Sequence, residues 1–106
     1  MKMCDDGTTI AALKTRIAAF AAARQWQQFH TGKNLAMSIA IEAAELMEHF
    51  QWAPPADEVI DQQEVAEELA DVLIYALAFA NSQGIDVTTA ILAKLDKNEH
   101  RFPVAR

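Results

Sequence analysis

The chain has 106 residues, enough for one small hydrophobic core, and we expect residues 1–106 to form a single domain. Hydrophobic residues make up 52% of the chain and charged residues 23%, which favours a globular protein over a disordered one. Fifteen acidic and nine basic residues give a net charge of −6, which argues against a protein that binds nucleic acid polymers. The single cysteine, Cys4, excludes an intrachain disulfide.

The sequence shows no targeting or membrane segment. Met1–Asp6 is polar, and the apolar region of a signal peptide does not follow it. The longest apolar stretch, Leu69–Ala80, is interrupted by Asp71 and is too short to span a bilayer. We therefore expect a cytoplasmic protein that does not contact membranes.

The first predicted helix begins in the region Asp5–Thr9, with Thr8 or Asp6 as its N-cap. It runs to a polar end at Arg24–Gln28, and His30–Gly32 then breaks the chain direction. Apolar residues recur within it at three- and four-residue steps, which is the helical period, at Ile10, Leu13, Ile17 and Phe20.

A second helix is predicted from Lys33 to about Gln51, and Pro54-Pro55 then prevents its continuation. The third follows an N-cap at Asp57 or Asp61 and ends at Gly84. Because the connection between these two helices is short, we expect them to pack antiparallel.

Asp86 is predicted to cap a fourth helix that runs from Val87 to about His100, with Ile91, Leu92 and Leu95 facing inward. The expected fold class is therefore all-α, a four-helix bundle. The apolar faces of these helices are wide and rich in alanine, which indicates burial on more than one side. We therefore expect oligomerisation to complete the core.

Two pairs of acids stand in otherwise apolar helical segments. Glu42 and Glu45 share one face of the second helix, and Glu68 and Asp71 share one face of the third. Either pair alone is most often solvated, but antiparallel packing of the two helices can bring all four carboxylates together. Acids in apolar surroundings are costly unless a cation neutralises them.

An all-oxygen site of this kind suits Mg²⁺, with Mn²⁺ possible, better than Zn²⁺. A di-iron bundle requires Glu-x-x-His pairs. Here Leu46 precedes His49 by three residues and Lys97 precedes His100, so the sequence does not fit that class. Mg²⁺ in turn favours chemistry on a phosphate.

Several longer motifs occur in order between about Arg24 and Pro103: Phe29–Leu35, Glu42–Trp52, Glu67–Tyr75, Lys94–Asn98 and Arg101–Pro103. Through them the chain resembles the MazG-like all-α nucleoside triphosphate pyrophosphohydrolases, and most of all the compact dCTP pyrophosphatase branch. Ile41 stands where many relatives carry another acid, and Phe102 where they often carry tyrosine, so that a phenol hydrogen bond is missing. These two departures leave the number of metal ions and the details of phosphate binding open.

The resemblance implies Mg²⁺-dependent hydrolysis of a (deoxy)nucleoside triphosphate to the monophosphate and pyrophosphate, as house-cleaning or control of the dNTP pool. It also implies a homodimer or a dimer of dimers whose interface helps form the pocket. The family's metal ligands fall on Glu42, Glu45, Glu68 and Asp71, its phosphate contacts on Lys94 and Asn98, and its base and sugar contacts on Trp26, Trp52 and Tyr75.

Other residues are weaker candidates. Lys33 could contact phosphate and His30 could line the pocket entrance, whereas His49 is expected to be packed or exposed without a catalytic role. Three other interpretations stay open at this point. The chain could hydrolyse a modified nucleotide or a non-nucleotide diphosphate, it could bind a nucleotide or a partner helix without hydrolysis, or its acids could be purely structural.

Overall fold

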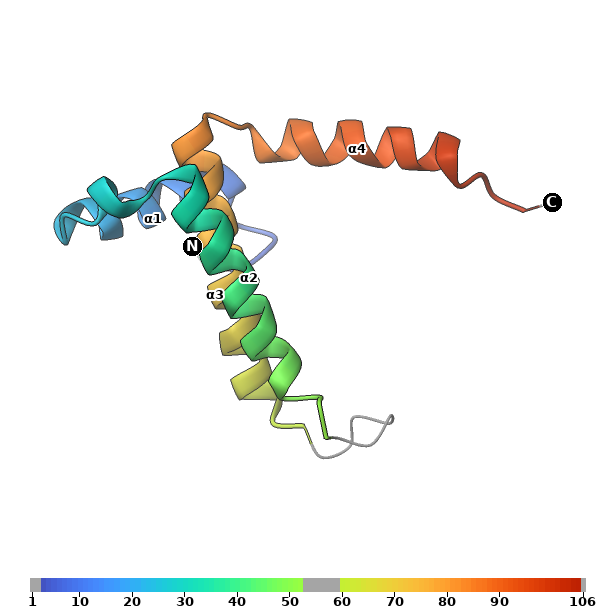
Figure 1. Cartoon of the computed structure of the whole chain (residues 1–106). Helices are drawn as coiled ribbons and strands as arrows, with labels where there is room; N and C mark the ends of the chain where they lie inside the picture. The colour runs from blue at the N-terminus through green and yellow to red at the C-terminus, as the bar shows by residue number, and fades with distance from the viewer. Residues whose placement is uncertain (1–2, 53–59, 106) are drawn as a thin grey trace.

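In the computed structural model, residues 3–52 and 60–105 are described. Within these ranges the chain forms α-helices and one short 3₁₀ helix, and no β-strand (Figure 1). This confirms the all-α, four-helix class. The expected stop at Pro54-Pro55 and the possible cap at Asp57 lie outside the described residues. The elements are α1 (Ile10–Ala23), η1 (Gln27–Phe29), α2 (Gly32–Glu48), α3 (Gln62–Gln83) and α4 (Val87–Arg101).

Each α-helix begins at a residue whose side-chain oxygen accepts a backbone N–H of the first turn, which satisfies a donor that has no partner within the helix. The predicted caps Asp61 and Asp86 are confirmed. The predicted cap of the first helix is wrong, because Thr9, rather than Thr8 or Asp6, accepts the Ala12 N–H at 3.0 Å. The caps are Thr9, Thr31, Asp61 and Asp86.

The first helix ends earlier than predicted, and the polar run does not continue it. Gln25 adopts the left-handed conformation with φ 57°, and the Trp26 N–H donates back to the Ala21 carbonyl at 3.0 Å. This is the geometry of a helix C-terminus that usually carries glycine, as Gly84 does after α3 with φ 66°. Because glutamine rarely adopts this conformation, the residue type at this position did not indicate the turn.

The helices α2 and α3 pack antiparallel along their length, as predicted, and α1 crosses α3 near its C-terminal end (Figure 1). The most deeply buried residues are mostly alanines, whose small side chains allow the helix backbones to approach closely. They are Ala21, Leu35, Ala78 and Ala80. The second helix ends at Glu48 rather than about Gln51, because its last turn tightens into i→i+3 bonds such as Phe50 N–H to Met47 O at 3.0 Å.

The fourth helix extends away from the other three (Figure 1). Ile91, Leu92 and Leu95 are between 49% and 62% exposed, so the prediction that they face inward is wrong for the single chain. The turn before α4 is fixed on α1, since Lys14 Nζ donates to the Ile85 carbonyl at 2.8 Å. No helix among the described residues is long and apolar enough to cross a membrane.

Candidate metal and nucleotide site

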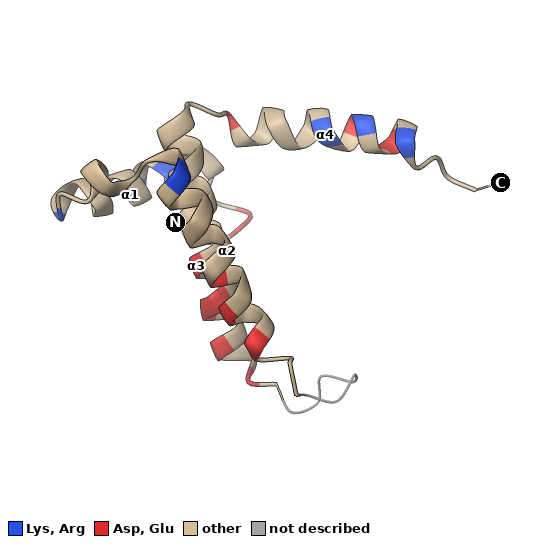
Figure 2. Ribbon diagram, viewed as in Figure 1, with Lys and Arg blue, Asp and Glu red and all other residues tan. Residues whose placement is uncertain are grey.

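Acidic residues gather along the half of the α2–α3 hairpin that lies farther from α1 (Figure 2). Glu42 on α2 and Glu68 and Asp71 on α3 each offer a carboxylate oxygen, and these oxygens lie within 4.8 Å of one another. We call these three residues the acid cluster. The antiparallel packing of two helices that each carry acids three residues apart brings them together, as the spacing predicted.

Glu45 lies beside the acid cluster without belonging to it. It lies one turn beyond Glu42 on α2, and its carboxyl group is close enough to raise the pKa of Glu42. It is exposed, whereas Glu42 and Glu68 are half-buried. The structure therefore brings together three of the four predicted ligands and places the fourth next to them.

The electrostatics of the acid cluster fit a divalent cation. Glu42 Oε2 and Glu68 Oε2 are buried and have no hydrogen-bond partner among the residues that the structure describes. Burial raises the pKa of Glu42, and the neighbouring carboxyl groups of Glu45, Asp71 and Glu68 raise it further. Buried carboxylate oxygens without a partner are costly, and a hard cation would satisfy them.

One basic side chain contacts the acid cluster, and sequence reasoning gave it no role. His49 Nε2 lies 3.6 Å from Glu68 Oε1, and His49 Nδ1 lies 3.9 Å from Glu64 Oε2. His49 follows Glu45 by four residues and so shares its face of α2, but this spacing does not tell which residues of α3 it meets.

An aromatic pocket of about 380 Å³ lies next to the acid cluster. Ser38 lies one turn before Glu42 on α2, and Tyr75 lies one turn after Asp71 on α3, so the pocket is about 6 Å from the acids along both helices. Its volume is within the range of small-molecule sites. It is lined by Trp26, Phe29, His30, Asn34, Leu35, Ser38 and Tyr75.

Three of the predicted nucleotide contacts, Trp26, His30 and Tyr75, thus meet in one pocket. The turn at Gln25 is what carries Trp26 there, and the Asn34 amide donates to the Phe29 carbonyl at 3.0 Å, which ties η1 to the start of α2. Tyr75 joins them from α3, the helix that also carries Glu68 and Asp71.

The remaining predicted contacts are not gathered around the acid cluster. Trp52, just after α2, is 88% exposed, and Lys33 is exposed in the first turn of α2. Lys94 and Asn98 lie on α4, which extends away from the hairpin that carries the acids (Figure 2).

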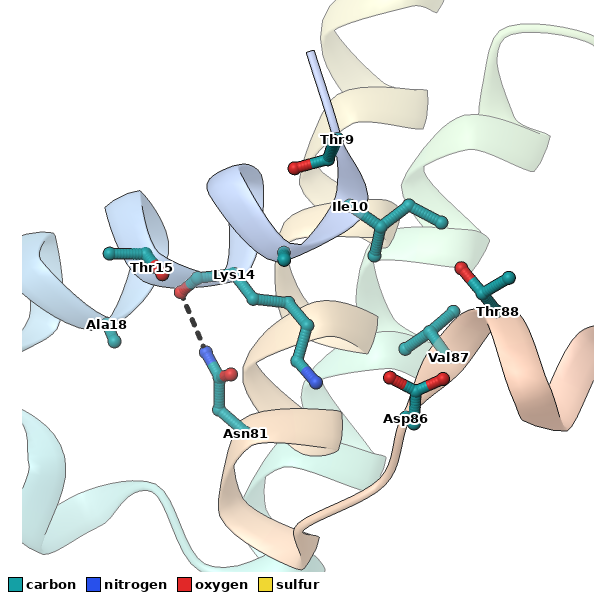
Figure 3. Close-up of a pocket in the computed structure, with 10 residues that line it drawn as sticks. Thr9, Ile10, Lys14, Thr15, Ala18, Asn81, Asp86, Val87 and Thr88 are labelled. Atoms are coloured by element: carbon teal, nitrogen blue, oxygen red, sulfur yellow. Dashed lines mark hydrogen bonds between the residues drawn. The ribbon is translucent and has the colours of Figure 1, made fainter.

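A larger pocket, of about 540 Å³, lies between α1 and the turn that joins α3 to α4. Figure 3 shows its polar groups engaged with one another, as where the Asn81 amide donates to the Lys14 carbonyl at 3.0 Å. Hydrogen bonds from the hydroxyl and backbone N–H of Thr89, and the charge of Lys14, lower the pKa of Asp86. These contacts hold the start of α4 in place and suggest no chemistry.

Comparison with known proteins places this arrangement in a family. The model of the MazG-like family matches residues 37–106. The dCTP pyrophosphatase 1 of Bos taurus is 40% identical over 102 residues, and that of Homo sapiens 38% over 101. These matches cover 91% and 90% of this chain, which spans about 60% of the length of these relatives.

A solved structure of a pyrophosphatase from Archaeoglobus fulgidus has the same fold. It superposes with a TM-score of 0.85 at 39% sequence identity, covering 97% of this chain and 100% of that one. The family model and these similarities agree with the motifs on α2 and α3. The chain therefore belongs to the MazG-like family.

Proposed function

We propose that this protein is a nucleotide pyrophosphohydrolase that converts a (deoxy)nucleoside triphosphate into the monophosphate and pyrophosphate. The observation that carries the proposal is the acid cluster, which lies one helical turn from an aromatic pocket. Two of its carboxylate oxygens are buried and lack a hydrogen-bond partner in the described part of the chain. The names of the similar proteins, dCTP pyrophosphatase 1 and pyrophosphatase, support this reaction class.

Glu42, Glu68 and Asp71, with Glu45 beside them, are the residues that would hold the divalent cation, Mg²⁺ or Mn²⁺. A cation bound there neutralises phosphate charge and lowers the pKa of a coordinated water. The hydrolysis itself needs no covalent enzyme intermediate. The oxygen of water bonds to one phosphorus of the α–β bridge and loses a proton to solvent, the bond from that phosphorus to the bridging oxygen breaks, and the monophosphate and pyrophosphate separate.

The aromatic pocket supplies the base and sugar contacts in this proposal. Trp26 and Tyr75 present aromatic faces for stacking, and His30 lies at the same pocket. Because the pocket and the acid cluster follow one another along the same two helices, a nucleotide bound with its base in the pocket extends its phosphates toward the acids. Trp52, Lys33, Lys94 and Asn98 complete the binding site in this proposal.

Lys94 and Asn98 require an explanation, because α4 extends away from the acids of its own chain (Figure 2). We propose a homodimer or homotetramer in which α4 packs against another copy. The chain exposes 8570 Å², against about 5,900 Å² for a compact monomer of its mass. An excess of this size is what obligate homo-oligomers bury.

The main alternative is a helical module that binds a nucleotide without hydrolysing it. The acid cluster favours the enzyme, because a binding module gains nothing from buried carboxylates that apolar residues could replace. Hydrolysis of a modified nucleotide is a variant of the same proposal, since the base depends on hydrogen bonds in the pocket.

Product analysis tests the proposal. Canonical and modified dNTPs are incubated with the protein and Mg²⁺, and in parallel with chelator, and products are separated by anion-exchange chromatography. We expect monophosphate and pyrophosphate in equal amounts with Mg²⁺ and neither with chelator, and the rates across the panel give the base. Orthophosphate and diphosphate as first products, or thermal shifts without any product, would contradict the proposal.

A further inference from the structure

His49 makes contacts to which the proposed reaction assigns no role. Among the residues that the structure describes, both contacts within 4.0 Å between a basic side-chain nitrogen and a carboxylate oxygen are made by this one imidazole, and both partners are glutamates of α3. His49 is the C-cap of α2, and its side chain is 23% exposed. It thus lies at the end of the acid cluster opposite the aromatic pocket.

The two oxygens of Glu68 have different surroundings. Oε1 lies 3.6 Å from His49 Nε2, while Oε2 is buried and has no hydrogen-bond partner within residues 3–52 and 60–105. The side chain is 24% exposed, so solvent reaches it from one side only. A glutamate with three rotatable bonds would otherwise turn toward solvent and away from the like charges of Glu42 and Asp71.

We infer that His49 is a positioning residue, which holds Glu68 through Oε1 so that Oε2 stays directed into the acid cluster for a divalent cation. The inference rests on the proposed function, because it assumes that the acid cluster binds metal. Groups that orient a metal ligand in this way commonly contribute 10- to 100-fold in metal affinity. The contact from Nδ1 to Glu64 is longer, and Glu64 is exposed, so that contact serves the hairpin and not the metal.

Two substitutions test the contacts of the two ring nitrogens of His49 separately. The amide nitrogen of glutamine reaches about where Nε2 of histidine lies, and the amide of asparagine reaches about where Nδ1 lies. His49→Gln therefore keeps a donor for Glu68, and His49→Asn keeps one for Glu64. His49→Ala keeps neither. His100→Gln is the matched control, because His100 lies on α4 and contacts the Asp96 carbonyl.

The test is the dissociation constant of Mn²⁺, read from the electron paramagnetic resonance signal of free Mn²⁺ with no nucleotide present. Thermal unfolding in chelator checks that each variant folds. We expect about 10-fold weaker binding in His49→Ala and in His49→Asn, and nearly unchanged binding in His49→Gln and His100→Gln.

Unchanged Mn²⁺ affinity in His49→Ala would overturn the inference and leave the proposed function standing. So would full affinity in His49→Asn with loss in His49→Gln, because the contact to Glu64 would then be the one that matters. If the unmodified protein bound no Mn²⁺, both the inference and the proposed metal site would be wrong.

Discussion

At the scale of single residues, the molecule concentrates unfavourable interactions at one place. Glu42 is crowded by Glu45, Glu68 and Asp71, and its buried Oε2 has no hydrogen-bond partner among the described residues. Natural proteins retain such an arrangement when a bound group compensates it. The cost therefore depends on the protonation of Glu42 and on the presence of a cation, and both can be varied.

Glu42→Gln tests this cost. Because burial and neighbouring acids raise the pKa of Glu42 above its ordinary value of 4.5, the folded state binds this proton more tightly than the unfolded state. The stability that Glu42 contributes is thus complete below pH 4.5 and lost as the pH rises through the raised pKa. In chelator, Glu42→Gln should therefore melt above the unmodified protein at pH 7 to 8, with a difference that shrinks toward pH 4.5.

Melting temperatures by circular dichroism across this pH range measure the effect. Glu67→Gln, an exposed glutamate of α3 adjacent to Glu68, is the control and should show no such difference. Added Mg²⁺ should raise the melting temperature of the unmodified protein and not that of Glu42→Gln. A Glu42→Gln variant that is less stable than the unmodified protein in chelator at pH 8 would show that the carboxylates do not repel one another.

At the scale of elements, the α2–α3 hairpin carries the candidate site, and separate contacts at its α1 end fix the start of α4. The α2–α3 hairpin holds both the acids and part of the aromatic pocket, so its register fixes the distance between them. The start of α4 is fixed instead by α1 and α3, through Lys14 and the cap at Asp86 (Figure 3). This second set of contacts sets the direction in which α4 leaves the hairpin.

Asp86→Asn tests how much the negative charge of Asp86 contributes to fixing the start of α4, since asparagine caps a helix as well as aspartate does. The contacts from Thr89 and the charge of Lys14 hold the pKa of Asp86 below 3.8 in the folded state. Asp86 thus stabilises the fold above pH 3.8, and the contribution is lost as the pH falls through the lowered pKa.

Urea unfolding from pH 7 to pH 3 measures this contribution. We expect the unmodified protein to be more stable than Asp86→Asn at pH 7 and the two curves to converge below pH 3.8. Equal stability of the two proteins throughout that range would show that hydrogen bonding alone, without charge, anchors the start of α4.

At the scale of the whole molecule, the single chain is more extended than a compact domain of its length. Its radius of gyration is 16.5 Å, against about 13 Å for a compact domain of this length. Part of the excess comes from α4, whose apolar side chains are exposed. These features support the proposed assembly, in which the fourth helix packs against another copy.

Leu92→Asp tests the proposed assembly. Leu92 is 62% exposed on α4, so a charge there costs little in the single chain and much in a packed interface. We expect light scattering after size exclusion to give a multiple of 11.7 kDa for the unmodified protein and a smaller assembly for Leu92→Asp. Lys97→Asp introduces the same side chain at a polar position of α4 and should keep the assembly. A mass of 11.7 kDa for the unmodified protein would contradict the proposed oligomer.

Much of the fold was predictable because local signals determined it. The caps Asp61 and Asp86, the C-terminal Gly84 and the helical periodicity all act within one turn of the chain. The turn at Gln25 and the outward direction of α4 were not predictable, since the first lacks the usual glycine and the second depends on Lys14, far away in sequence.

The candidate site was likewise predictable only in part. Spacing within each helix placed the acids on common faces, and the short connection predicted that the two faces meet. The role of His49 depends on the register between α2 and α3, which decides that its ring meets Glu64 and Glu68. Periodicity within one helix carries no information on that register.

The measurement that tests the central claim most directly is the rate of pyrophosphate release by Asp71→Asn, compared with Glu67→Gln, from the best dNTP at saturating Mg²⁺. Both variants remove one negative charge from α3, but only Asp71 belongs to the acid cluster. We predict a loss of about 100-fold or more in Asp71→Asn and near-full activity in Glu67→Gln. Near-full activity in Asp71→Asn would contradict the assignment of the acid cluster as the metal site.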